Sequence, residues 1–171
     1  MPDLQRVTTE YVKAEDRLRL TDELAPGDIV VLWLTQRLVH RLVGHLCRSL
    51  DDQTSHKSPS REMQANVIQS FTQQAARAQL PSQPAVQASK TSQQWLVTSI
   101  DVIHTACKIT LSFKSEKPGG QARLTLDEQP LRQWLSIVFE LCCKVGWPVK
   151  VWPDWVRDAS QPAGLASTLL Q

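Results

Sequence analysis

The sequence has only six glycines, and they do not have the spacing of a phosphate-binding loop. Neither G-x-x-x-x-G-K nor G-x-G-x-x-G occurs, although nucleotide-binding loops need such glycines so that backbone N–H groups can approach phosphates. The four cysteines form no C-x-x-C pair and have no histidines at zinc-type spacing. We therefore expect no cofactor and no metal, and we expect that the protein is not an enzyme.

Long apolar runs and a strong charge of one sign are also missing. The longest apolar run near the N-terminus, Ile29 to Leu34, is far too short to cross a bilayer. The first residues lack the apolar region of a signal peptide. The formal net charge of +2 at pH 7 predicts no strong attraction of the whole surface to nucleic acid or anionic membrane. We expect a cytoplasmic protein with reduced thiols and no membrane partner.

The sequence does contain strand-like alternation, most clearly in its second half. Residues 108–114 and 122–126 each alternate apolar and polar side chains, and a Pro-Gly-Gly turn separates them. The β-branched residues of 97–103 predict a strand before them. Asp127 is a candidate helix N-cap. Apolar residues then recur at helical spacing in Leu131, Trp134, Leu135, Val138 and Cys142.

The first half repeats this order. We match Val7 with Val97, Val12 with Val102, Leu18 with Ile109, Leu20 with Leu111, and 32–34 with 124–126. Pro26-Gly27-Asp28 supplies a turn, and Thr35 is the candidate N-cap of the helix that follows. The predicted fold is therefore α+β, with two similar β-β-β-α halves of antiparallel strands and a helix on one face. Because each half has little core of its own, we expect shared packing, through either one six-stranded sheet or helix–helix contact.

A different segment lies between the halves. Ser58-Pro59 predicts the start of an inserted amphipathic helix, and the Pro/Ser/Gln-rich stretch from Leu80 to Ser92 predicts a linker. The apolar positions of this helix are Met63, Val67, Ile68, Phe71 and Ala75. After the second half, prolines in the Trp-rich tail argue against a regular helix. The expected divisions of one compact domain are 1–52 (first half), 53–93 (inserted helix and linker), 94–146 (second half) and 147–171 (tail).

The repeated order resembles that of the PC4, Whirly and PUR-type single-strand nucleic-acid binders. Leu124-Thr125-Leu126-Asp127 leading into Leu131-Arg132-Gln133-Trp134-Leu135 looks like their last strand and helix. In those families such units pair about a twofold axis to give a curved sheet. The resemblance covers the order of elements in most of both halves and includes no family-specific motif, so it implies a fold and not a function.

Histidine and cysteine positions do not predict a reactive site. His40, His45 and Cys47 are spaced five and two residues apart, so their side chains diverge around a helix instead of converging on zinc. The Cys142-Cys143 pair lies in an apolar stretch and is best explained by core packing. His104 and Cys107 fall in a predicted hairpin turn that has no orienting acid in an evident motif.

Two groups of residues are candidate binding surfaces. Trp147, Trp152 and Trp155 have large rings that are costly to leave in water, so the tail either folds back onto the chain or docks on a partner. Arg37, Arg41 and Arg48 form a basic row on the helix of the first half. This row is either a solvated helix surface or a phosphate-binding one.

The leading hypothesis is a non-enzymatic binding or assembly protein that acts through protein–protein contacts, with an unknown partner or by self-association. The inserted helix and the Trp-rich tail would form the contact surface. The alternative is single-stranded nucleic-acid binding through the arginine row or a basic sheet face, where Trp33 or Tyr11 would stack on bases.

Overall fold

The protein is described by a computed structural model that covers residues 1–25, 27–54 and 59–161. The first half contains β1 (Arg6–Val12), β2 (Arg17–Ala25), β3 (Asp28–Thr35) and α1 (Gln36–Thr54). The second half contains β5 (Ser99–His104), β6 (Lys108–Lys114), β7 (Gln121–Asp127) and α3 (Glu128–Val145). Helix α2 (Pro59–Ala78) lies between them in sequence. The predicted α+β fold with two β-β-β-α halves and an inserted helix is thus confirmed.

Two short elements were not foreseen. Strand β4 (Gln93–Leu96) precedes β5, so the predicted strand 97–103 begins earlier and is interrupted around Thr98. Helix α4 (Asp154–Ala159) lies in the tail, where the prolines were expected to prevent a helix. This expectation was wrong because Pro153 occupies the N-cap position of α4, where proline interrupts no helical hydrogen bond.

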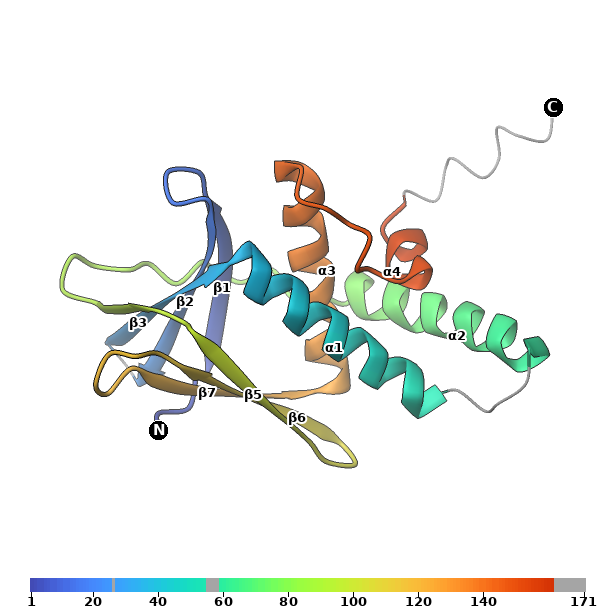
Figure 1. Ribbon diagram of the computed structural model, residues 1–171, viewed down its shortest axis with the longest axis horizontal. Coiled ribbons are helices and arrows are strands. Elements are labelled where there is room, and N and C mark those ends of the chain that lie inside the picture. Colours follow the sequence, from blue (N-terminus) through green and yellow to red (C-terminus); the bar gives the residue numbers. More distant parts are fainter. Residues whose placement is uncertain (26, 55–58, 162–171) are drawn as a thin grey trace.

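The strands form two sheets, one in the order β1-β2-β3-β4 and one in the order β5-β6-β7. Antiparallel pairing joins β1, β2 and β3, and likewise β5, β6 and β7. The strands gather at one end of the molecule, and α2 and α4 lie at the other (Figure 1). The sequence suggested either one six-stranded sheet or helix–helix contact between the halves. The described residues form no six-stranded sheet, because β1, β2 and β3 lie in one sheet and β5, β6 and β7 in another.

The halves instead exchange short segments. Strand β4 of the second half pairs in parallel with β3 of the first, with Gln94 beside Val31. Reciprocally, Asp3 forms a parallel bridge to Arg123 on β7, and the Leu4 N–H donates to the Arg123 carbonyl at 2.7 Å. Val31 and Arg123 each lie five residues before the helix of their half, so the two exchanges are equivalent.

The registers also show which residues of the two halves correspond. Leu20 faces Leu32, and Leu111 faces Leu124, as the sequence match predicted. The match of the first strands was wrong. In the ladders Val7 pairs with Asp22 and Ile100 pairs with Phe113, so the counterpart of Val7 is Ile100 and not Val97. The shift arises because the second half has extra residues at the point where β4 passes into β5.

One hydrophobic core serves both halves. The inward residues of β2, β3, β6 and β7 pack with the apolar faces of α1 and α3, which fits the rule that small modules gain stability by sharing a core. The Leu38 N–H donates to Thr35 Oγ1 at 3.3 Å, so the predicted N-cap of α1 is confirmed. Asp127 is the N-cap residue of α3, but its side chain makes no capping hydrogen bond.

Three sequence predictions fall partly outside the described residues. These are the turn at Pro26, the helix start at Ser58 and the end of the tail, residues 162–171. Within the described part, α2 begins at Pro59 and Gly27 has a φ of 88°, a backbone conformation that glycine adopts at little cost.

Candidate protein-binding surface

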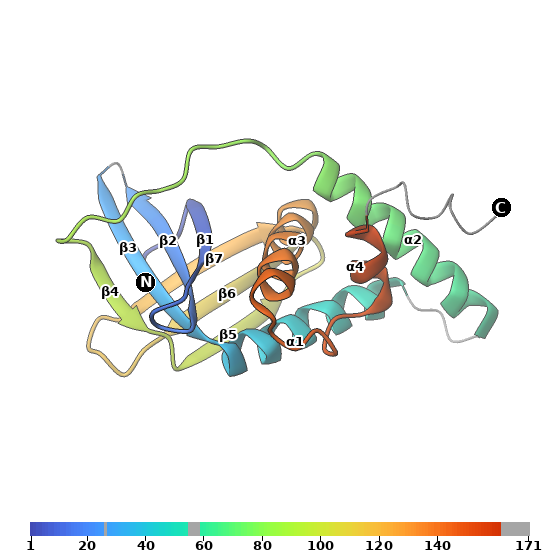
Figure 2. The same ribbon diagram turned by 90° about the horizontal axis from the view of Figure 1, so that it is seen from above.

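Helix α2 is amphipathic as predicted, but its apolar face points to solvent. The side chains of Met63, Val67, Ile68 and Phe71 are 75%, 51%, 56% and 67% exposed. Met63, Val67 and Phe71 recur every four residues, which places them on one side of the helix. We call these four side chains the α2 surface. The helix lies at the end of the molecule away from the strands, with α3 and α4 beside it (Figures 1 and 2).

The opposite face of α2 is polar and buried. Gln73 is completely buried, and its Nε2 donates to the Arg132 carbonyl at 2.8 Å and to Ser136 Oγ at 2.7 Å. Gln69 Oε1 accepts a hydrogen bond from Arg132 at 2.5 Å, and the Arg132 guanidinium also pairs with Glu128 at 2.8 Å. These bonds satisfy most of the polar groups that would otherwise be costly to bury. Among the described residues, Gln73 Oε1 and Arg132 Nη1 are buried without a hydrogen-bond partner. The hydrogen bonds that are made therefore fix which face of α2 points inward.

The tryptophans of the tail are packed inside the chain. Trp147 meets the rings of Tyr11 and His40 edge-on, at centroid distances of 5.7 and 6.1 Å. Trp152 is 1% exposed and meets Phe139 edge-on at 5.2 Å. Of the two outcomes expected from the sequence, the tail therefore folds back.

Trp155 has the same kind of environment. It is 1% exposed, and its Nε1 donates to Asp51 Oδ1 at 2.8 Å. The Arg132 guanidinium carbon lies 5.5 Å from the centre of its ring, within cation–π range. Because Trp147, Trp152 and Trp155 have no large exposed ring surface, we do not include them in the protein-binding surface.

The arginine row lies on the surface, as predicted. Arg37, Arg41 and Arg48 are all exposed on α1, and none of the ion pairs among the described residues involves them. The row does not face one space. Arg41 borders a groove between α1 and β5, whereas Arg48 borders a depression next to Val151 and Asp154.

Most cations on the strands have carboxylate neighbours, and Arg6 on β1 is the exception among the ion pairs of the described residues. The pairs are Arg17 with Glu15, Arg19 with Glu10, Lys108 with Asp127, Lys114 with Asp101, and Arg123 with Asp3. Trp33, a predicted stacking platform, is half-buried and lies under the Arg19 guanidinium, 6.0 Å from its centre. The positive charge that a single nucleic-acid strand would need on the sheet is thus largely balanced.

Histidine and cysteine side chains also have defined environments. Among the described residues, His104 forms hydrogen bonds with Ser49 and His45 and none with Cys107. Its Nδ1 lies 2.9 Å from Ser49 Oγ, and its Nε2 lies 3.2 Å from His45 Nε2. Burial raises the pKa of the Cys47 thiol to about 12, so this thiol stays protonated at neutral pH. No group of three or more metal-binding side chains occurs in the described ranges.

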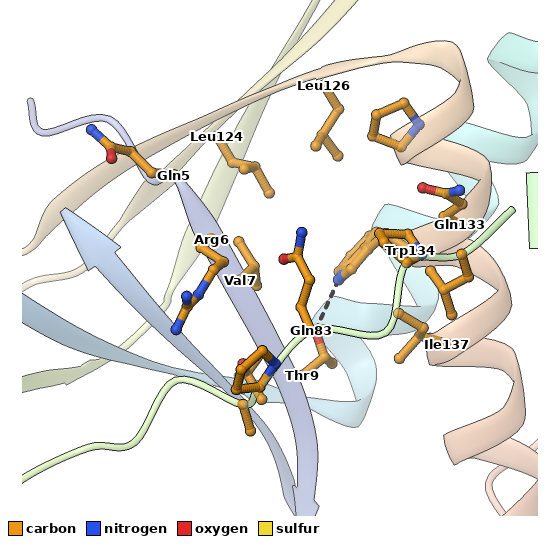
Figure 3. A pocket seen from close by; sticks show the side chains of 16 residues that line it. Gln5, Arg6, Val7, Thr9, Gln83, Leu124, Leu126, Gln133, Trp134 and Ile137 are labelled. Atoms are coloured by element: carbon orange, nitrogen blue, oxygen red, sulfur yellow. Dashed lines mark hydrogen bonds between the residues drawn. The ribbon is translucent and has the colours of Figure 1, made fainter. Parts of the chain in front are cut away.

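A cavity of about 380 Å³ lies between β1 and α3. Val7 and Thr9 line it from β1, and Trp134 and Ile137 line it from α3. The linker after α2 crosses its mouth, and Gln83 extends between Val7 and Trp134 (Figure 3). Trp134 Nε1 donates to Thr9 Oγ1 at 3.0 Å across the cavity. We call this space, with the linker over it, the closed groove.

The α2 surface was visible in the sequence as an apolar stripe, but its exposure was not. None of the described helices combines the length and hydropathy that a membrane span requires. Comparison with protein-family models, with curated proteins and with solved structures finds no match to this chain.

Proposed function

We propose that this protein is a non-enzymatic binding and assembly protein, and that it binds another protein chain through the α2 surface. The observation that supports the proposal is the inverted arrangement of α2. Its polar residues Gln69 and Gln73 are buried, whereas Val67 and Phe71 are exposed. Contiguous exposed apolar side chains with a polar rim are typical of protein interfaces.

The chemistry of the α2 surface defines the kind of partner. The neighbouring exposed residues Gln64, Asn66 and Gln74 are uncharged, and the exposed Glu62 next to Met63 is acidic, so the neighbourhood offers hydrogen bonds and one negative charge. An apolar helix face of this form fits an apolar groove or a second helix of the partner. Covering one large apolar side chain contributes about 1.5–3 kcal/mol, which in a complex must offset the entropy lost on association.

The test replaces Phe71 with glutamine and compares it with Ile103→Gln. Phe71 and Ile103 are 67% and 57% exposed, and Ile103 lies on β5, outside the α2 surface. Because both side chains are exposed, both variants should unfold thermally like the wild type. Self-association is measured by sedimentation velocity over a concentration series, and binding to other proteins by capture with the tagged, full-length chain.

We expect Phe71→Gln to weaken association about tenfold or more, since about 1.4 kcal/mol corresponds to a factor of ten. Ile103→Gln should have no such effect. The proposal is wrong if the wild type stays monomeric at high concentration and Phe71→Gln captures the same proteins in the same yield.

Single-stranded nucleic-acid binding is a second proposal, and we restrict it to α1. It is favoured by the exposure of Arg37, Arg41 and Arg48. Labelled single-stranded DNA and RNA should then bind with an affinity that falls as salt increases, and Arg37→Glu combined with Arg41→Glu should weaken that binding. Lack of binding at low salt would remove this function.

A further inference from the structure

The closed groove has a counterpart in the other half. A second groove, of about 390 Å³, lies between β5 and α1. Its walls come from Leu38, Arg41, Leu42 and His45 on α1 and from Thr98, Ser99, Ile100 and Val102. Among the described residues, no linker crosses it. We call it the open groove.

The equivalence follows residue by residue from the ladders and the helix starts. Because α1 starts at Gln36 and α3 at Glu128, Leu42 corresponds to Trp134. The strand residues correspond through their partners, since Val7 pairs with Asp22 and Ile100 pairs with Phe113. The corresponding pairs in the two grooves are Leu38 and Pro130, Arg41 and Gln133, Leu42 and Trp134, His45 and Ile137, Ile100 and Val7, and Val102 and Thr9.

The closed groove shows what such a groove holds. The linker lies over it without helix or strand structure, and it brings Pro81, Gln83 and Pro84 to the rim. The Val86 N–H donates to Thr8 Oγ1 at 2.8 Å, and the Val86 side chain is only 6% exposed. The groove therefore holds an extended, proline-containing and uncharged segment of the chain itself.

The open groove keeps the features that hold the linker. Leu38, Ile100 and Val102 are half-buried and provide an apolar floor. The counterpart of Thr8 on the ladder is Asp101. Its Oδ2 pairs with Lys114 Nζ, and its other carboxylate oxygen can accept a peptide N–H. Strand β5 is at the edge of its sheet, so its outer backbone groups are available to an extended chain. In Figure 2 the linker runs along the side of β1 and α3, and α1 and β5 lie on the opposite side.

The two grooves carry their basic side chains on different walls. On the helix wall of the open groove, Arg41 and His45, both exposed, replace Gln133 and Ile137, whereas Arg6 on the strand wall of the closed groove is replaced by Ser99. A segment that fits the open groove should therefore carry acidic side chains that face Arg41. The linker has no acidic side chain.

We infer that the open groove binds an extended, proline-containing, acidic segment of a protein partner, in the way that the closed groove holds the linker. This site is separate from the α2 surface and does not depend on it. The contact would combine apolar side chains on the floor, a peptide N–H on Asp101 and carboxylates on Arg41.

The test uses a labelled synthetic peptide with the sequence of residues 80–89, changed by Gln83→Glu and Gln87→Glu. Its binding to the full-length protein is followed by fluorescence anisotropy. We expect a dissociation constant on the order of 10 to 100 µM, and weaker binding of the unchanged sequence because it lacks the carboxylates.

Arg41→Glu should weaken binding of the acidic peptide about tenfold or more. Arg48→Glu is the matched control, because it makes the same change of charge on the same helix at a residue that borders a different depression. Both arginines are exposed, so both variants should fold like the wild type, which circular dichroism checks.

Three results would overturn the inference. The first is no binding of the acidic peptide to the wild type at millimolar concentration. The second is equal loss of binding in Arg41→Glu and Arg48→Glu, which would indicate attraction to charge alone. The third is unchanged binding in Arg41→Glu, which would place the peptide elsewhere, for example in the closed groove after displacement of the linker.

Discussion

Replacing Asp22 with asparagine should stabilise the protein in a way that depends on pH. Asp22 is completely buried on β2. Its Oδ1 accepts hydrogen bonds from the N–H groups of Gln5 at 2.9 Å and Arg6 at 3.2 Å. Among the described residues, its Oδ2 is buried without a hydrogen-bond partner. The corresponding position of the second half holds Phe113, so a carboxyl group here occupies a site suited to an apolar side chain.

The size of the effect follows from the pKa of this carboxyl group. Burial raises its pKa from 3.8 to about 6, although the backbone hydrogen bonds oppose the rise. One pKa unit corresponds to about 1.36 kcal/mol, so ionised Asp22 costs about 3 kcal/mol above its pKa in the folded protein. Because the folded pKa is the higher one, the folded state is favoured while the carboxyl stays protonated. This advantage is lost as pH rises through about 6.

The side-chain amide introduced by Asp22→Asn would keep an acceptor oxygen for the N–H groups of Gln5 and Arg6 but would not ionise. We therefore expect the variant to be more stable than the wild type by up to about 3 kcal/mol near pH 8. Near pH 4 the two proteins should have similar stability. Urea unfolding followed by tryptophan fluorescence measures this, since the chain has six tryptophans. A stability difference that does not change with pH, or a variant less stable than the wild type near pH 8, would refute the reasoning.

Three further predictions concern α1 and its neighbours. A Cβ on Gly44 would lie 2.9 Å from Val151 Cγ2. The change in unfolding free energy caused by Gly44→Ala should therefore be less favourable, by about 1–3 kcal/mol, when Val151 is present than when it is replaced by alanine. Thr35→Ala should cost about 1 kcal/mol of unfolding free energy, because it removes the N-cap bond to Leu38. Burial and the nearby charge of His45 lower the pKa of His104. The folded protein therefore loses stability as pH falls through the ordinary pKa of histidine, and His104→Gln should be less sensitive to acid than the wild type.

Each of these has a clear contrary result. Equal effects of Gly44→Ala in both backgrounds would mean that Val151 does not limit the space. An unchanged unfolding midpoint in Thr35→Ala would mean that water replaces the cap. Parallel pH profiles of His104→Gln and the wild type, measured by thermal unfolding, would mean that the lowered pKa of His104 has no effect on stability.

Much of the fold could be predicted because the strands alternate clearly. Leu18 and Leu20 on β2, like Ile109 and Leu111 on β6, face the core in the registers that the sequence match required. The exchange of β4 and the N-terminal residues could not be predicted in the same way. These segments are short, and parallel pairing between Val31 and Gln94 leaves no local pattern.

The orientation of α2 was also beyond the sequence. An apolar stripe predicts that a helix has two unlike faces, and burial of the apolar face is the usual outcome. Here Gln69 and Gln73 turn inward because Arg132 and Ser136 on α3 offer them hydrogen bonds. Those partners lie about sixty residues away in sequence and are brought together only by the shared core. The same dependence on long-range packing explains why the sequence could not decide whether the tryptophan tail folds back onto the chain or docks on a partner.

The reciprocal exchange of segments has a consequence for synthesis on the ribosome. While the first half emerges, β3 lacks β4, and residues 2–4 lack β7 until residue 123 has been made. Closing contacts over so many residues is entropically costly and slow. The nascent first half must therefore wait with an unpaired strand edge, and a chain that stalls within the linker exposes that edge to other chains.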